Sequence, residues 1–432
     1  MRQRDLMTTT SLPINVADVR IGMYIQLDVG WLHHPFPVNR FKVTSQSQLD
    51  TLRSSGLQAV RFIPARSDPG ISAVHAAATA TPPTTNEAVS DVSATPPCEP
   101  AVPVPPVQPP SSAEPEAHFD FAAHCYRYLS AQVQGQPHAA QVVADKLVGG
   151  YVQELGQSSE AMMRWLSEVT NEHMEAHSVN VMVLSLLLGK AWGFNEQQLY
   201  QLGMAALLHD IGKVKLAPEV QELRPHMSIQ DVLAYESHVD ASVAIGRSMG
   251  LAPEILNAIA QHHELANGSG FPLHLPGHAL GLHSQILALA NCYDRLCNPS
   301  AQVEGHTPHE AISVLFAQRR QDFSADVMTT FVHVIGVYPP GSVVQLNDDR
   351  FAIVVSVNTS RPLKPHVLVY DAHVPRHAAT VLDLGQQPQI TIKRSLRPAQ
   401  LPRPVLEYLS PRPRIRYFFE RAIDAATSRL TT

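Results

Sequence analysis

The chain has 432 residues, of which 44% are hydrophobic and 16% are charged, and its formal net charge is -6 with histidine counted as neutral. This length is enough for two or three domains, and the charge argues against a nucleic acid polymer as partner because no global basic field is present. The four cysteines form no C-x-x-C pair (Cys98, Cys125, Cys292 and Cys297). They therefore argue against a disulfide scaffold or a thiolate metal site and suit a reducing cytoplasm.

No targeting or membrane segment is expected. The first residues, MRQRDLMTTTSLPIN, lack the apolar core of a signal peptide. The best apolar run, Val179 to Leu188, is only about half as long as a membrane-spanning helix. We therefore expect a cytoplasmic protein with no membrane partner.

The N-terminal part divides into a small folded module and a linker. Within residues 13–66, VADVRIGMYIQLDVGW alternates β-prone and turn residues, and QSQLDTLRSSGLQAVRFI predicts a helix, a glycine stop and a strand. Residues 67–117 are rich in Ala, Pro, Thr and Ser. Such a composition cannot bury enough apolar surface to offset the entropy of ordering, so a disordered linker is expected.

The rest of the chain predicts a helical bundle followed by a β-rich tail. From residue 118 to 336, apolar residues recur at three- and four-residue spacing, with Gly193, Pro218 and Pro253 between the segments. This pattern predicts an all-α bundle. Residues 337–432 begin with two β-rich runs around Asn-Asp-Asp, which predict a hairpin, continue with a strand at HVLVYDA and include one terminal helix. The predicted fold is thus mainly α, with a small α/β N-terminal module and a small β-rich C-terminal tail.

The strongest chemical signal is LLHDIGK, residues 207–213, in which His209 and Asp210 close an apolar helix. Further histidines follow the same pattern at helical positions (His177, His238, His262 and His263). Imidazole nitrogens and a carboxylate that can bridge are the ligands that two divalent first-row metals need. A single histidine in a helix is more often a hydrogen-bonded core residue, but this many in one order favour a metal site.

These residues resemble the HD-GYP branch of the HD phosphohydrolases, which hydrolyses cyclic di-GMP. The resemblance spans about His173 to Gly336, and HHELANGSGFP stands where the family has HHE-x-x-D-G-x-G-Y-P. FSADVMTTF is similar to the family's closing FDP motif. The N-terminal GMYI and WLHHPF elements resemble an uncharacterised module that often precedes HD-GYP domains; Trp31 and Phe36 are expected in its core, and a regulatory or dimerisation role is expected for it.

The resemblance implies roles for named residues. Asp210 would bridge two metals, iron or manganese, with His177, His209 and Asn291 on the first ion and His238, His262 and His263 on the second. Lys213 would face the scissile phosphate and act in catalysis with Asp210. The turn would lie close to substrate through four residues (Gly268, Gly270, Phe271 and Pro272).

Several positions depart from the family pattern on one side of this site. ANCYDRL replaces ADVYDAL, so a neutral Asn291 stands at a metal-binding aspartate and Asp294 is retained. His173 replaces a glutamate that supports a third metal; it could restore ligation or face solvent. Ser300 and Val303 stand where phosphate-binding cations are expected. Arg295 is a neighbouring cation that could substitute for them, but we expect it in solvent.

Three functional hypotheses follow. The first is a phosphodiesterase that opens cyclic di-GMP to pGpG or GMP. The second is a degenerate, non-catalytic module that binds nucleotide or recruits other signalling proteins, and a homodimer is compatible with both. The third, oxygenase chemistry on a di-iron site, is supported by no feature of this sequence.

Overall fold

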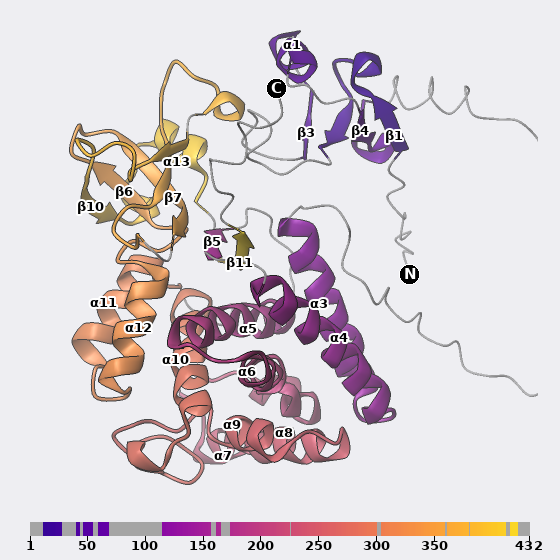
Figure 1. Cartoon of the computed structure of the whole chain (residues 1–432), viewed down its shortest axis with the longest axis vertical. Coiled ribbons are helices and arrows are strands. Elements are labelled where there is room, and N and C mark those ends of the chain that lie inside the picture. Colours follow the sequence, from indigo (N-terminus) through magenta and orange to yellow (C-terminus); the bar gives the residue numbers. More distant parts are fainter. Residues whose placement is uncertain are drawn as a thin grey trace, which may run out of the picture. The chain divides into compact units, whose positions relative to one another are not determined.

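The computed structural model describes residues 12–27, 40–43, 46–54, 59–68, 115–156, 161–165, 173–224, 226–299, 304–358, 361–379, 381–411 and 415–421. Apart from a few residues at its two ends, the predicted linker lies outside this range, as do Trp31 and Phe36. The described residues form two compact units, an N-terminal one and a larger one that holds the other α-helices and the C-terminal strands (Figure 1).

The N-terminal unit is a small antiparallel sheet with one α-helix. Strands β1 (Leu12–Asn15), β4 (Ala59–Phe62), β2 (Tyr24–Gln26) and β3 (Arg40–Lys42) pair in this order, and α1 (Gln46–Ser54) follows β3. Val60 and Phe62 alternate with exposed residues along β4 and join Leu49 and Leu52 of α1 in one apolar core. The predicted helix and the strand after it are therefore confirmed.

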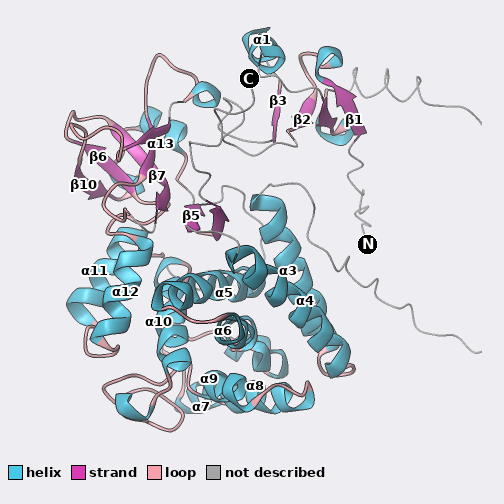
Figure 2. Ribbon diagram, viewed as in Figure 1, coloured by secondary structure: helices cyan, strands magenta, loops and turns pink. Residues whose placement is uncertain are grey.

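The larger unit is built around two buried helices, α5 (His173–Trp192) and α6 (Glu196–Leu208). α5 packs against α3 (Pro115–Gln132), α10 (Leu282–Cys297) and α12 (Ala325–Ile335), while α6 packs against α4 (Pro137–Gly156) and α9 (Pro253–Ala260). The remaining α-helices of the bundle are α7 (Ile229–Glu236), α8 (His238–Ser248) and α11 (Pro308–Gln318). Figure 2 shows that helices dominate this unit, as predicted.

The apolar run from Val179 to Leu188 is the buried middle of α5. Its side chains belong to the main core, which extends from Phe119 to Tyr417. In the part of the chain that the structure describes, no helix is both long and apolar enough to cross a membrane.

The second sheet corrects the prediction that residues 118–336 are entirely helical. It is seven-stranded with the order β10-β6-β7-β5-β11, and β8 and β9 extend it from β7. Most of its strands come from the C-terminal part (β6, Val343–Leu346; β7, Phe351–Asn358; β8, His366–Val369; β9, Val381–Asp383; β10, Ile392–Leu396; β11, Tyr417–Arg421). β5 (Ala161–Trp165) comes from the helical segment and pairs with β7 and β11. Its five residues are too few to show a clear period, and its strand partners are distant in sequence.

The predicted hairpin is confirmed, since β6 and β7 are antiparallel neighbours joined at Asn347 to Arg350. The HVLVYDA strand is confirmed as β8. A short helix, α13 (Arg403–Leu409), precedes β11, and residues 422–432 lie outside the described range.

Candidate metal centre

His209 and Asp210 lie where α6 ends. The helix begins with a capping box between Asn195 and Gln198, continues through a buried apolar stretch and ends at Leu208, after which Asp210 leads into a 3-10 turn (Ile211–Lys215). Gly212 allows this turn to touch the start of α8, because a Cβ there would lie 2.2 Å from the carbonyl oxygen of His238. This close approach places the Asp210 carboxylate beside the His238 ring.

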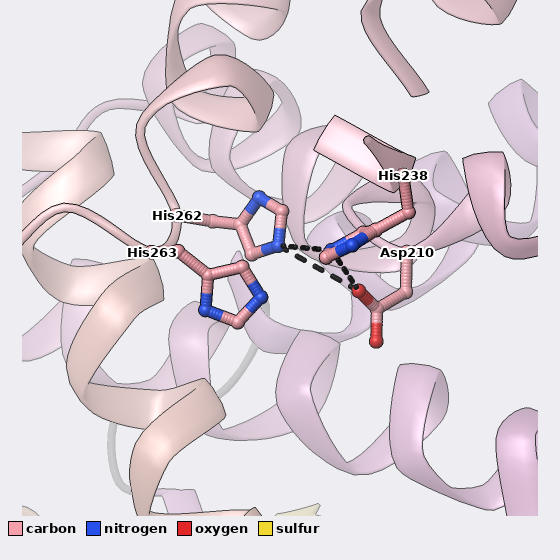
Figure 3. Close-up of side chains that lie close together, drawn as sticks. All are labelled: Asp210, His238, His262 and His263. Atoms are coloured by element: carbon pink, nitrogen blue, oxygen red, sulfur yellow. Dashed lines mark hydrogen bonds and ion pairs between the residues drawn. The ribbon is translucent and has the colours of Figure 1, made fainter. Parts of the chain in front are cut away.

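Three histidine side chains converge on one side of Asp210 (Figure 3). The Asp210 Oδ1 lies 3.1 Å from His238 Nε2 and 3.6 Å from His262 Nε2, and these two nitrogens are 3.3 Å apart. With His263, which follows α9 like His262, each residue offers one ligand atom, and all these atoms lie within 4.8 Å of one another. We call this set (Asp210, His238, His262 and His263) the complete set.

Backbone contacts orient two of these rings. His238 Nδ1 lies 2.5 Å from the carbonyl oxygen of Tyr235, and His262 Nδ1 lies 2.6 Å from that of Ile259. Because a carbonyl can only accept a hydrogen bond, each Nδ1 carries the proton and each Nε2 keeps its lone pair. Two lone pairs facing each other at 3.3 Å cannot form a hydrogen bond, whereas a cation between them would satisfy both.

Burial keeps the rings of His238 and His263 neutral. It lowers the pKa of His238 to about 4 and the pKa of His263 well below its ordinary value, and the positive charge of Arg295 adds to the effect on His263. Burial would raise the pKa of Asp210, but Lys213, His209 and Arg295 hold it well below the ordinary value. Neutral imidazoles and an ionised carboxylate are the states in which these groups ligate metals.

His263 is the best evidence that this set fits a metal ion. Its Nε2 is buried and has no hydrogen-bond partner among the described residues. Its ring stacks on Phe271, with centroids 4.3 Å apart and planes at 22°. A buried ring nitrogen without a partner costs free energy, so the donors of the complete set fit a divalent first-row metal ion.

The loop that carries Phe271 is held by glycine and by a buried acid. A Cβ on Gly270 would lie 2.4 Å from the carbonyl oxygen of His263, so only glycine fits. The carboxylate of Glu264 accepts hydrogen bonds from the backbone amides of Leu273 (2.6 Å) and Leu275 (2.8 Å). Glu264 therefore fixes the loop rather than facing the metal set.

A second group lies on the other side of Asp210 and consists of His177, His209 and Asp210 itself. The Nε2 atoms of His177 and His209 are 3.3 Å apart, and they lie 3.7 Å and 3.5 Å, respectively, from Asp210 Oδ2. Asn291 is buried nearby, but its Oδ1 accepts a hydrogen bond from Arg295 Nε at 2.9 Å. We call His177, His209, Asp210 and Asn291 together the first-half set.

The expectation that Arg295 lies in solvent was wrong. Its side chain is 29% exposed, and its Nη2 lies 3.1 Å from Asp210 Oδ2. Its Nη1 donates to the Tyr235 hydroxyl at 2.6 Å. The nearby negative charge and hydrogen-bond acceptors outweigh the cost of burial.

Asp294 orients His177 of the first-half set through the ring nitrogen that faces away from Asp210. Its Oδ2 lies 2.6 Å from His177 Nδ1, and its Oδ1 accepts hydrogen bonds from Asn180 and Asn298, each at 2.8 Å. Both asparagines also donate to the carbonyl oxygen of Ile415, at 2.8 and 2.9 Å. A C-terminal segment is thereby tied to the metal-facing helices α5 and α10.

A cavity of about 190 Å³ opens beside Asp210, and His177, Lys213 and Arg295 are among its lining residues. The Lys213 Nζ lies 2.6 Å from Asp210 Oδ2. Burial lowers the pKa of Lys213 to about 8, although Asp210 opposes this effect. The lysine is therefore mostly protonated at neutral pH and gives the cavity a positive charge.

The structure thus gathers all the predicted metal ligands and Lys213, but the predicted substrate-binding turn is separate from the cavity lining. Gly268, Gly270, Phe271 and Pro272 are not among the lining residues of this cavity. Their contact with substrate remains a prediction. Nothing is described for the side chain of His173 or for Ser300 and Val303.

Sequence reasoning missed the supporting roles of Tyr235, Asn180, Asn298 and Glu264. A signal existed for the asparagines, because Asn180 follows His177 by three residues and Asn298 follows Asp294 by four, which places each pair on one helix face. Nothing in the sequence connects Tyr235 with Arg295, since 60 residues separate them.

Comparisons with protein families match three consecutive parts of the chain. Residues 161–327 match an HD domain, residues 343–403 match a KOW domain associated with HD domain, and residues 11–162 match a domain of unknown function, DUF3391. The residues that match the HD domain include both ligand sets.

Among curated proteins, the chain is similar to a cyclic di-GMP phosphodiesterase of Pseudomonas aeruginosa, with 25% identity over 90% of this chain and 92% of that protein. It is also 25% identical to a cyclic di-GMP phosphodiesterase of Borreliella burgdorferi, over 44% of this chain and 50% of the relative. A 3'3'-cGAMP-specific phosphodiesterase of Vibrio cholerae is 27% identical over 36% of this chain and 30% of the relative. Among solved structures, an HDG"Y"P protein from Bdellovibrio bacteriovorus aligns with a TM-score of 0.42 and 16% identity, over 74% of this chain and 98% of that chain.

Proposed function

We propose that this HD-domain protein is a metal-dependent phosphodiesterase that hydrolyses cyclic di-GMP to pGpG or GMP. The observation that carries the proposal is the convergence of Asp210 and three histidines beside a cavity that Lys213 lines. The extent of similarity to the Pseudomonas aeruginosa phosphodiesterase supports this substrate. The buried free thiols of Cys125 and Cys297 agree with a cytoplasmic location, which we also propose.

The complete set would hold iron or manganese, because both metals accept mixed nitrogen and oxygen ligands. A divalent ion there supplies Lewis acidity toward a phosphoryl oxygen and toward an attacking water. Lys213 places a positive charge in the cavity, where the phosphodiester gains negative charge during hydrolysis. His177 presents its Nε2 lone pair to the same space, because Asp294 fixes the proton on Nδ1. The second ion that the sequence predicts would need the first-half set.

The cavity is smaller than the about 300–1,000 Å³ of typical ligand pockets, so we expect it to hold one phosphodiester while the bases extend beyond it.

We propose that the chain divides into four parts. These are a regulatory module (13–66), a linker (67–117), a catalytic domain (118–336) and a tail (337–432). We also propose that the N-terminal module mediates dimerisation or binds other signalling proteins.

The alternative, a non-catalytic nucleotide-binding or interaction module, has one observation in its favour. Asn291 is neutral, and Arg295 contacts both its oxygen and that of Asp210. Such a module would bind cyclic di-GMP or a protein partner without turnover.

The test is hydrolysis of cyclic di-GMP by anaerobically purified protein loaded with iron or manganese. We expect pGpG or GMP as product from the wild type, and none from a variant with both His209→Ala and Asp210→Ala. His333→Ala, an exposed histidine on α12, is the matched control and should keep wild-type activity. Binding without product would support the alternative, and hydrolysis of 3'3'-cGAMP in place of cyclic di-GMP would correct the substrate.

A further inference from the structure

Arg295 lies on α10, and its guanidinium contacts two oxygens of the first-half set. Its Nε donates to Asn291 Oδ1 at 2.9 Å and its Nη2 donates to Asp210 Oδ2 at 3.1 Å. These are the two oxygen atoms that a metal ion in the first-half set would need. A guanidinium is always charged and presents its donors in a planar fork, so it can contact both oxygens at once.

A third contact fixes the guanidinium in this position. Its Nη1 donates to the hydroxyl of Tyr235, whose side chain is fully buried. The guanidinium carbon also lies 5.9 Å from the centroid of the Tyr235 ring, which is within the range of a cation–π contact. Arg295 is thus anchored at Nε, Nη1 and Nη2, so its position does not depend on a substrate.

The negative charge of Asp210 is already more than neutralised without an ion in the first-half set. Its one carboxylate contacts two cations through Oδ2, Lys213 Nζ at 2.6 Å and Arg295 Nη2 at 3.1 Å. The neighbouring carboxylate, Asp294, is occupied by His177 and two asparagines. A divalent ion between His177, His209 and Asp210 would therefore lie beside two positive charges and find no free carboxylate.

The complete set differs on each of these points. It uses Asp210 Oδ1, whereas both cations contact Oδ2. The Nδ1 atoms of His238 and His262 bond to backbone carbonyls, so their Nε2 lone pairs are available to a cation, and the Nε2 of His263 has no partner among the described residues. One half of the site is thus prepared for a metal ion, and the other half already holds a cation.

We propose that the guanidinium of Arg295 takes the place of a metal ion in the first-half set, so that this chain binds one divalent ion rather than two. The inference rests on the proposed metal-dependent function and determines its stoichiometry. It replaces the two-ion site expected from the sequence with a mixed site of one metal ion and one arginine.

The experiment counts bound Mn²⁺ on metal-free full-length protein, by anaerobic titration calorimetry and elemental analysis. Electron paramagnetic resonance of the loaded protein is the second measurement, because two neighbouring Mn²⁺ ions couple magnetically and one isolated ion does not. The variants are Arg295→Met, which keeps bulk without charge, and a double variant with Asn291→Asp and Arg295→Ala. Arg247→Ala, an exposed arginine on α8, is the matched control.

We expect one uncoupled ion per chain in the wild type and in Arg247→Ala. The double variant should bind two coupled ions, the second at least tenfold more tightly than any second ion in the wild type. Arg295→Met should also bind a second ion more tightly than the wild type. This variant keeps the proposal testable if the double variant does not fold. Two coupled ions in the wild type, or one in every folded variant, would overturn the proposal.

Hydrolysis assays on the same samples separate this inference from the proposed function. If the wild type binds two ions and hydrolyses cyclic di-GMP, the phosphodiesterase function is supported and the proposed role of Arg295 is contradicted. If the wild type binds one ion and does not hydrolyse cyclic di-GMP, the role of Arg295 is supported and the catalytic function is contradicted. If Arg295 instead binds a substrate phosphate, its replacement would raise KM. The variants would then bind the same number of Mn²⁺ ions per chain as the wild type, which also contradicts the proposal.

Discussion

At the scale of single residues, Lys213 is the group whose charge should matter most for turnover. Its ammonium lines the cavity 2.6 Å from Asp210 Oδ2. Replacing it with alanine should lower kcat about 100-fold, the usual effect of removing one preorganised charged donor. Lys215→Ala, two residues along the same turn and exposed, should change kcat less than twofold. Steady-state kinetics on cyclic di-GMP provide the measurement, and equal effects from the two lysines would refute a specific role for Lys213.

Asp294 should act mainly through stability. Asp294→Asn removes a buried charge that accepts hydrogen bonds from Asn180 and Asn298 and pairs with His177. Hydrogen bonds to charged groups contribute about 1.5–3 kcal/mol each, so we expect the free energy of unfolding to fall by at least about 2 kcal/mol. Denaturant unfolding measures this loss, with Asp240→Asn on α8 as an exposed control that should cost less than about 1 kcal/mol. A loss no larger than that of the control would show that the network contributes nothing to stability.

At the scale of elements, the loop from His262 to Pro272 depends on Gly270. A Cβ there would overlap the backbone of His263, Glu264 and Leu265, so Gly270→Ala must shift the loop. Because Phe271 stacks on the His263 ring, we expect metal affinity to fall at least tenfold in calorimetric titration. Gly281→Ala is the control, since a Cβ there would meet only Ser284 Oγ at 3.8 Å. Unchanged affinity in Gly270→Ala would mean that the loop does not position His263.

The C-terminal segment should stabilise the metal-facing helices. The backbone of Ile415 and Tyr417 bonds to Asn180 and Asn298, and β11 pairs with β5 just before α5. Ending the chain after residue 411 should therefore lower the Tm by at least about 5 °C, since several buried hydrogen bonds are lost. Ending it after residue 421 keeps β11 and serves as control. Equal Tm values for the two truncations would contradict this role.

The same elements show how far the sequence predicts the structure. Helical periodicity and turn residues were sufficient for α1, α5, α6 and the β6–β7 hairpin, because these patterns are local. The metal ligands were found because His209 and Asp210 close an apolar helix and the other histidines follow in order. β5 and the contact of Arg295 with Asp210 were missed, because each depends on partners far away in sequence.

At the scale of the whole molecule, metal binding should stabilise the fold. An ion that binds the folded chain at 100 times its Kd adds about 2.7 kcal/mol to the free energy of unfolding. We expect Mn²⁺ to raise the Tm of the wild type and of His333→Ala, but not of a variant with both His238→Ala and His262→Ala. An equal rise in that double variant would place the ion elsewhere.

We propose that the complete set and the adjacent Lys213-lined cavity form a phosphodiesterase site. The most direct measurement is the rate of cyclic di-GMP hydrolysis as metal-free protein is loaded stepwise with Mn²⁺ under anaerobic conditions. We predict that the rate rises linearly up to one ion per chain and then stays constant, and that His262→Ala removes it. A rate of zero at every metal loading would contradict the claim, and a rate that appears only after a second ion binds would contradict the single-ion site.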